Sequence, residues 1–140
     1  MATFEEYNDR LRSLGVSAPL NAIWLRAQGR CEYCGVDLLE LHEVYRGADS
    51  DHLLPKSLYP LLIDKLNNYV MACASCHKLK GHRYDPGNGD ARWQNVSDLT
   101  DDERKQLIDI VIARIRPLRE EQKRQLLAAK DFIRLYISTT

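Results

Sequence analysis

The sequence has 140 residues, and its 20 Lys and Arg balance 20 Asp and Glu, so the formal net charge is zero. Hydrophobic residues make up 44% and charged residues 29%, which is ordinary for a globular protein and argues against disorder. The length suits one domain over residues 1–140. Because the charge is balanced, bulk charge cannot indicate nucleic-acid binding, and such a function must rest on local chemistry.

The first residues lack the basic and apolar regions of a secretory signal. No apolar run approaches the ~20 residues that a membrane span needs. We therefore expect a cytoplasmic protein that does not enter a membrane, in a reducing compartment where structural disulfides are rare.

In chain order, residues 1–29 predict two helices. Thr3 and Glu6 form a capping box for the first helix, which Gly15 ends. Ser17 is the expected cap of the second helix, and Gly29 is its expected end.

The middle region, residues 30–84, predicts short elements. A knuckle at residues 31–35 precedes a short helix that Asp37 and Glu40 cap and that runs through Tyr45. Residues 50–54 and 69–72 predict strands of a small hairpin. A short helix from Ala74 to about His82 follows.

Residues 85–99 have the composition of a loop. Residues 100–138 predict C-terminal helices, which begin at a capping box of Thr100 and Glu103. Apolar residues from Leu107 to Ile115 form one stripe, and Leu126, Ala129, Ile133, Tyr136 and Ile137 form another. Pro117 separates the stripes, and the sequence leaves open whether it makes a kink or a hairpin. The predicted fold class is α+β and mostly helical.

The four cysteines form two C-x-x-C pairs, Cys31 with Cys34 and Cys73 with Cys76. In a reducing compartment, two such pairs indicate four thiolates around one structural zinc ion. Buried or redox-active cysteines are the alternative. The gap between the pairs is 38 residues, from Gly35 to Ala72, which is longer than the roughly 12–20 residues of a simple zinc ribbon.

The segment between and beside the cysteine pairs carries an acid, two imidazoles and an amide. His52 suits the role of a general base, because the unperturbed pKa of histidine is about 6.5. Asn68 could hold that imidazole through its amide carbonyl. Asp51 and His77 offer oxygen and nitrogen ligands for Mg²⁺, Mn²⁺ or a similar ion. Together these groups suit hydrolysis of a phosphodiester.

The pattern C-x2-C … D-H-L-L-P-K-S … N-Y-V-M-A-C-A-S-C-H-K-L-K-G resembles the HNH endonuclease family, over roughly residues 30–84. The resemblance implies a ββα-metal core clamped by a four-cysteine zinc site and flanked by helices. It implies His52 as the general base, Asn68 as the residue that orients it, and Asp51 and His77 as ligands of a catalytic divalent ion. His82 falls one residue away from the position of an extra family ligand and is left out of the metal site.

The resemblance implies that the protein hydrolyses phosphodiester bonds in DNA, using Zn²⁺ for structure and Mg²⁺ or Mn²⁺ for catalysis. Because the chain carries no net positive charge, we expect weak binding to DNA, and a partner protein or a homodimer is expected to assist. A non-catalytic zinc module and an RNA-directed nuclease toxin are the alternatives. The basic cluster of Lys78, Lys80, His82 and Arg83 either contacts phosphates or forms a solvated helix end.

Overall fold

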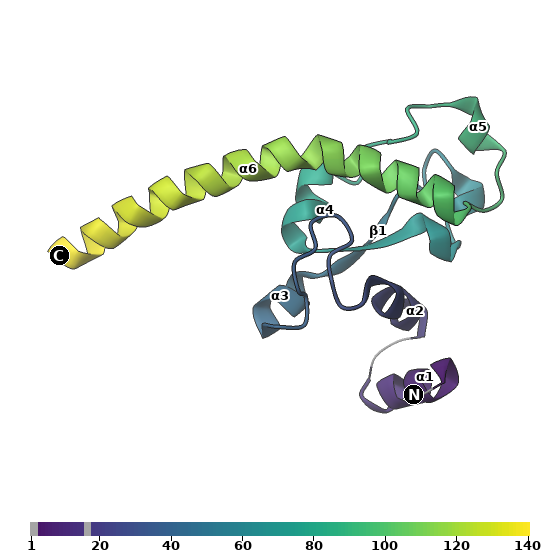
Figure 1. The fold of residues 1–140 in the computed structure, drawn as a ribbon, viewed down its shortest axis with the longest axis horizontal. Helices are drawn as coiled ribbons and strands as arrows, with labels where there is room; N and C mark the ends of the chain where they lie inside the picture. The colour runs from purple at the N-terminus through teal and green to yellow at the C-terminus, as the bar shows by residue number, and fades with distance from the viewer. Residues whose placement is uncertain (1–2, 16–17) are drawn as a thin grey trace.

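The structure, a computed structural model, describes residues 3–15 and 18–140 (Figure 1). Ser17, the expected cap of the second helix, lies outside the described residues. The capping box of Thr3 and Glu6 is confirmed, since each residue's backbone N–H donates to the other's side chain. The elements in chain order are α1 (Phe4–Ser13), α2 (Ala18–Ala27), α3 (His42–Gly47), β1 (Asp49–His52), the 3-10 turns η1 (Pro60–Leu62) and η2 (Leu66–Asn68), β2 (Tyr69–Ala72), α4 (Ala74–Lys80), α5 (Ala91–Gln94) and α6 (Asp101–Thr139).

The centre of the fold is a two-stranded antiparallel sheet followed at once by a helix. β1 pairs with β2 so that Asp51 lies opposite Val70 and His52 lies opposite Tyr69. Only Cys73 separates β2 from α4, and its side chain accepts a hydrogen bond from the N–H of Cys76 as the helix cap. The predicted mostly helical α+β fold with a small ββα core is therefore confirmed.

The first strand is shorter than predicted, because Asn68 takes over the hydrogen bonds that a longer strand would use. The backbone N–H of Leu53 donates to the Asn68 carbonyl, and the N–H of Leu54 donates to the Asn68 side-chain oxygen, both at 2.8 Å. The Asn68 amide nitrogen in turn donates to the carbonyls of Leu54 and Leu62. This fully buried amide satisfies the backbone where the chain leaves the sheet.

Two short helices also differ from the expectation at their ends. α3 begins at His42 rather than near residue 37, because the Asp37 carboxylate accepts from the N–H of Leu39 in a local turn instead of capping a helix. α4 ends at Lys80, where Gly81 adopts a φ of +78° that glycine tolerates best.

α6 is one helix that passes through Pro117 without forming a hairpin, and it curves gently (Figure 1). The proline removes the donor for the carbonyl of Ala113, but both residues are exposed, so water can bond to that carbonyl. The Thr100–Glu103 capping box is confirmed. Within the described residues, no helix is both long enough and apolar enough to cross a bilayer.

The first part of α6 closes the core, and the rest extends beyond the body of the protein (Figure 1). Leu107, Val111 and Ile115 are each at most 2% exposed, and α6 packs against α4 and η2. These residues join a core cluster that also includes Ile23, Leu38, Leu53, Leu54, Tyr59, Leu62, Val70, Met71 and Trp93.

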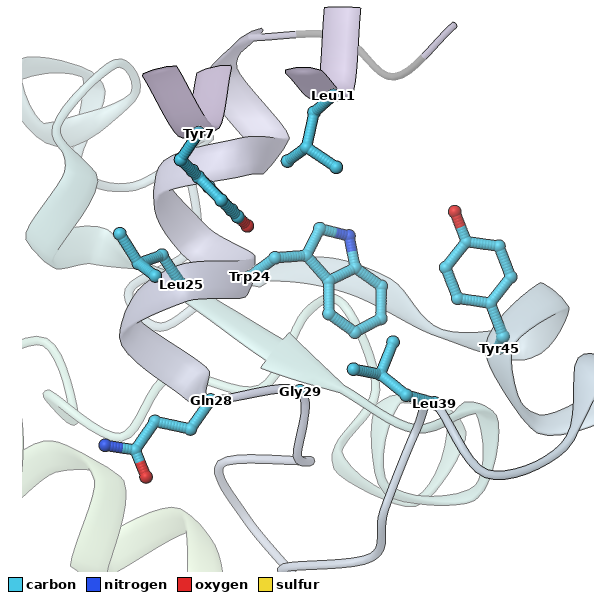
Figure 2. A pocket seen from close by; sticks show the side chains of 8 residues that line it. All are labelled: Tyr7, Leu11, Trp24, Leu25, Gln28, Gly29, Leu39 and Tyr45. Atoms are coloured by element: carbon cyan, nitrogen blue, oxygen red, sulfur yellow. The ribbon is translucent and has the colours of Figure 1, made fainter. Parts of the chain in front are cut away.

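A shallow apolar groove of ≈370 Å³ lies between α1, α2 and the α3 region (Figure 2). Trp24 stacks on Tyr45 with ring centroids 5.5 Å apart, and Tyr7 and Leu39 also line the groove. Gly29 adopts a φ of +71°, and a Cβ at this position would lie 2.5 Å from Leu39 Cδ1. Any larger residue would therefore strain the backbone and push Leu39 into the groove.

The two halves of α6 should differ sharply in their contribution to stability. Leu107→Ala removes buried methyl groups and should lower the free energy of unfolding by about 2–5 kcal/mol. Leu135→Ala, at a position 63% exposed on the same helix, should change it by less than about 0.5 kcal/mol. Urea denaturation measures both values, and equal losses would contradict the packing described above.

Candidate metal and catalytic site

The four cysteine sulfurs gather in one place. All four ligand atoms lie within 4.8 Å of one another, and the Sγ atoms of Cys34 and Cys73 are 3.8 Å apart. A tetrahedral ion with Zn–S bonds of about 2.3 Å places its sulfurs about 3.8 Å apart. The cluster can therefore hold a zinc ion, with all four positions filled by protein and none left for a water.

Local hydrogen bonds form the first of the two knuckles that carry these sulfurs. The N–H of Cys31 donates to Val36 and the N–H of Gly35 donates to Cys31, which folds the chain back on itself. Gly35 adopts a φ of +79° in this turn. The second knuckle is the cap of α4, so a helix start presents Cys73 and Cys76.

The sulfurs strongly perturb one another. Hydrogen bonds from the other three thiols, that of Cys31 first, hold the pKa of Cys34 well below its ordinary value. The same kind of interaction, again with Cys31 first, raises the pKa of Cys76 far above its ordinary value. A first thiolate thus forms readily and a fourth does not, so a bound cation is what would keep all four sulfurs ionised.

Glu32, inside the first knuckle, ties that knuckle to the sheet and to α6. Its backbone N–H donates to Met71, and its carboxylate accepts from the N–H of Met71 at 2.7 Å. Its other carboxylate oxygen accepts from Arg104 of α6 at 2.7 Å. The knuckle is therefore fixed to two distant parts of the chain independently of any metal.

The predicted catalytic side chains share one cleft beside this cluster. A cleft of ≈420 Å³ is lined by Asp51, His52 and His77, which come from the end of β1 and from α4. The remaining lining residues are Ser50, Pro55, Lys56, Ser57, His82 and Arg83. The structure thus brings three of the four predicted site residues together, and it adds His82, which sequence reasoning left out.

Asp51 is buried, and its two carboxylate oxygens have different surroundings. Oδ2 accepts from the Tyr33 hydroxyl at 2.7 Å and pairs with Lys80 Nζ at 3.0 Å. Oδ1 faces His77 Nδ1 at 3.5 Å. Burial, followed by the charge of Asp51, raises the pKa of Tyr33 well above its ordinary value, so this hydroxyl keeps the proton that it donates. Oδ2 is therefore held by two donors, while Oδ1 remains available to bind an ion.

His77 is placed to bind an ion together with Asp51. Its Nδ1 is buried and has no hydrogen-bond partner among the described residues, which is the condition of an atom that lacks its ligand. Its Nε2 lies 3.9 Å from Asp49, on the same face of β1 as Asp51. The 3.5 Å between Nδ1 and Asp51 Oδ1 can be spanned by one ion with ligand bonds of about 2.1 Å. The two side chains thus fit a divalent ion.

His52 is oriented by a backbone carbonyl. Its Nε2 lies 3.2 Å from the carbonyl oxygen of Ile63, and its ring packs against Tyr69 with centroids 4.6 Å apart. A carbonyl only accepts, so Nε2 carries the proton and a neutral His52 ring has its lone pair on Nδ1. The arrangement leaves Nδ1 as the atom able to take a proton.

Asn68 does not make the predicted contact with His52. All the hydrogen bonds of its amide go to Leu54 and Leu62, as described for the fold. It holds the loop that supplies the Ile63 carbonyl, so its link to His52 runs through the backbone. The correction arises because a buried amide is satisfied by the nearest backbone groups, and the strand ends within its reach.

Lys80 also differs from the expectation of a phosphate contact or a solvated helix end. Its Nζ is buried, pairs with Asp51 and donates to the His52 carbonyl at 2.9 Å. Tyr33 and Asp49 were likewise not predicted as parts of the site. Lys56, His82 and Arg83 also line the cleft, and all three are exposed.

Two antiparallel strands that lead directly into a helix, clamped by four cysteines, define the ββα-metal class of folds. Residues 31–83, a little over a third of the chain, match the family model described as HNH endonuclease. The resemblance inferred from the cysteine and histidine pattern is thereby confirmed, and it places this segment in a nuclease-type family. Comparisons with curated proteins and with solved structures gave no match.

Zinc should be required for the folded core. Because structural zinc sites contribute roughly 10–16 kcal/mol of apparent binding free energy, stripping the metal should unfold the ββα region. Cys76→Ser should lose bound zinc, whereas Ser75→Ala, at the exposed neighbouring position, should keep it. Elemental analysis with circular dichroism measures both effects, and a metal-free protein that melts at the wild-type temperature would refute this role.

Proposed function

We propose that this protein is a metal-dependent endonuclease that hydrolyses phosphodiester bonds in DNA. The observation that carries the proposal is the shared cleft, in which His52 lies beside the paired atoms Asp51 Oδ1 and His77 Nδ1. The HNH match to residues 31–83 supports the reaction class. The site residues, the catalytic ion and the DNA substrate are parts of this proposal.

In the proposed reaction His52 Nδ1 takes a proton from a water molecule in the cleft. The water oxygen attacks phosphorus, and the bond from phosphorus to the 3′ oxygen breaks. The products are a 5′-phosphate and a 3′ oxygen that takes a proton from solvent. The Ile63 carbonyl keeps the imidazole in the tautomer that can accept the proton, and it stabilises the imidazolium that forms.

Asp51 and His77 would hold Mg²⁺ or Mn²⁺, which supplies Lewis-acid stabilisation of negative charge on the phosphate and the leaving oxygen. Lys56 and Arg83 lie at the same cleft and suit contacts with the phosphates beside the scissile one. The zinc would act in the fold alone, because its ligand set is complete.

The role of His52 can be tested on supercoiled plasmid with Mg²⁺ or Mn²⁺. His52→Ala should reduce the cleavage rate by about 100-fold or more, because the general base is lost. Zinc content should not change. His42→Ala is the matched control, since His42 is exposed at the start of α3 and is not among the residues that line the cleft.

Parallel reactions with single-stranded DNA and RNA separate the rival functions. Wild-type activity on RNA alone would indicate an RNA-directed nuclease. Cleavage of no substrate at all would indicate a zinc module that only binds. Wild-type rates in His52→Ala would contradict the assignment of the base.

The pair formed by Lys80 and Asp51 should control binding of the divalent ion. Lys80→Met leaves the Asp51 carboxylate held by Tyr33 alone, so Oδ1 loses its fixed position. We expect binding of Mn²⁺ to zinc-loaded protein to weaken by about 10–100-fold in calorimetry. Lys78→Met, at the exposed position on the same helix, should leave the affinity unchanged. Equal affinities in the two variants would show that Lys80 does not position Asp51.

A further inference from the structure

The second half of α6 carries an apolar face that nothing in the described chain covers. Leu107, Val111 and Ile115 bury this face against the body, and Leu118, Leu126, Ala129, Ile133 and Tyr136 continue it at helical spacing, with Gln122 as the polar position between Leu118 and Leu126. The large side chains from Leu118 to Tyr136 on this face are 45–64% exposed. All residues from 120 to 140 are exposed, and α6 extends away from the rest of the fold (Figure 1).

We propose that a second copy of this chain covers this face, through antiparallel pairing of the two α6 helices about a two-fold axis near Asp131. The pairing does not depend on the proposed nuclease activity. Large apolar side chains that gather in the open on one side of a helix mark association surfaces.

The shape of the molecule selects the antiparallel direction. The body of the protein covers the apolar face from Leu107 to Ile115. A partner helix running parallel and in register would have to pass through that space. An antiparallel partner instead points its own body past residue 140 of the first helix, so both bodies lie clear of the paired segment.

The side chains along this face are complementary in size in the antiparallel register. With the axis at Asp131, Leu126 faces Tyr136 of the partner subunit, and Ala129 faces Ile133 of the partner subunit. A small residue therefore meets a large one, as close packing requires. Phe132 of each copy lies beside the axis, where the two rings can pack together. The two Lys130 residues also approach the axis, and their long stems allow the charges to reach water.

A hollow beside α6 can accommodate the C-terminal end of the partner's α6. A hollow of ≈510 Å³ is lined by Ser75 at the start of α4 and by Arg119, Gln122, Lys123, Gln125, Leu126 and Ala129 of α6. The α6 residues from Gln122 to Ala129 are the ones that the partner's last turns would face. The hollow thus meets the paired segment at the point where the body ends, with Leu126 and Ala129 as its apolar residues.

The extent of the paired face suits a small dimer interface. In this register the partner helix reaches residues 122–140, so Leu126, Phe132, Ile133 and Tyr136, at 53–71% exposure, form the covered apolar face. An interface of this extent lies at the small end of the range of about 1,200–2,000 Å² for specific complexes. Residues 114–134 contain seven Lys and Arg against three Asp and Glu, so the two helices repel weakly at low salt. Moderate salt should screen this repulsion.

Sedimentation of the zinc-loaded full chain at about 0.3 M salt tests the pairing. Wild-type protein should sediment at twice the 16.2 kDa chain mass at micromolar concentration. Ile133→Glu should weaken dimerisation by at least about 100-fold, because a carboxylate would be buried against Ala129 of the partner subunit. Leu127→Glu is the control, since Leu127 is 63% exposed and lies off the apolar face, so its dimer should persist.

Circular dichroism should show the wild-type helix content in both variants, so that a loss of dimer is not a loss of fold. Small-angle scattering of the dimer should show two bodies about 60 Å apart, because each body lies about 20 residues from the axis at 1.5 Å per residue. A wild-type monomer at every concentration would overturn the proposal, as would equal disruption by the two variants. A compact dimer with adjacent bodies would overturn the antiparallel arrangement.

Discussion

Four sulfur atoms within 4.8 Å of one another are the constraint on which this fold depends. They join two chain pieces, at Cys31–Cys34 and Cys73–Cys76, that are far apart in the sequence. Each piece also sends one side chain toward Asp51. Tyr33 lies within the first cysteine pair and donates to Oδ2, and His77 directly follows the second pair and faces Oδ1. The cysteine cluster that joins the two chain pieces therefore also positions the side chains that contact both carboxylate oxygens of Asp51.

The two carboxylate oxygens of Asp51 have different partners. A buried carboxylate is costly unless it is paired, and Lys80 and Tyr33 meet that need at Oδ2. Oδ1 and the orphaned His77 Nδ1 then remain together at the cleft. Lys80 also holds the carbonyl of His52, so the same ammonium fixes the carboxylate and the backbone of the imidazole beside it. The buried pair explains how two adjacent residues of a short strand can serve one cleft.

Much of this arrangement could be predicted from the sequence, because it rests on local chemistry. The two C-x-x-C pairs, both capping boxes and the strand at residues 69–72 depend on neighbours a few positions apart, and the structure confirms them. The HNH segment was recognisable because cysteines, histidine and asparagine coincide in order.

The remaining features depend on contacts between distant residues. Burial of Lys80 follows from its approach to Asp51, which no spacing along the chain reveals. The partner of His52 is the Ile63 carbonyl, a backbone atom that has no residue signature. Asn68 was expected to bind His52, but its amide is satisfied by Leu54 and Leu62 first. The course of α6 through Pro117 was open because it depends on whether solvent reaches the Ala113 carbonyl.

The central claim is that the fold holds two separate metal sites. A zinc ion at the four cysteines stabilises the core, and a divalent ion at Asp51 and His77 takes part in catalysis. Anomalous diffraction from crystals of zinc-loaded protein soaked in Mn²⁺ tests it most directly. The account predicts a zinc signal at the centre of the four sulfurs and a separate manganese signal bonded to Asp51 Oδ1 and His77 Nδ1. Manganese at another position, or a cysteine cluster that holds no zinc, would contradict it.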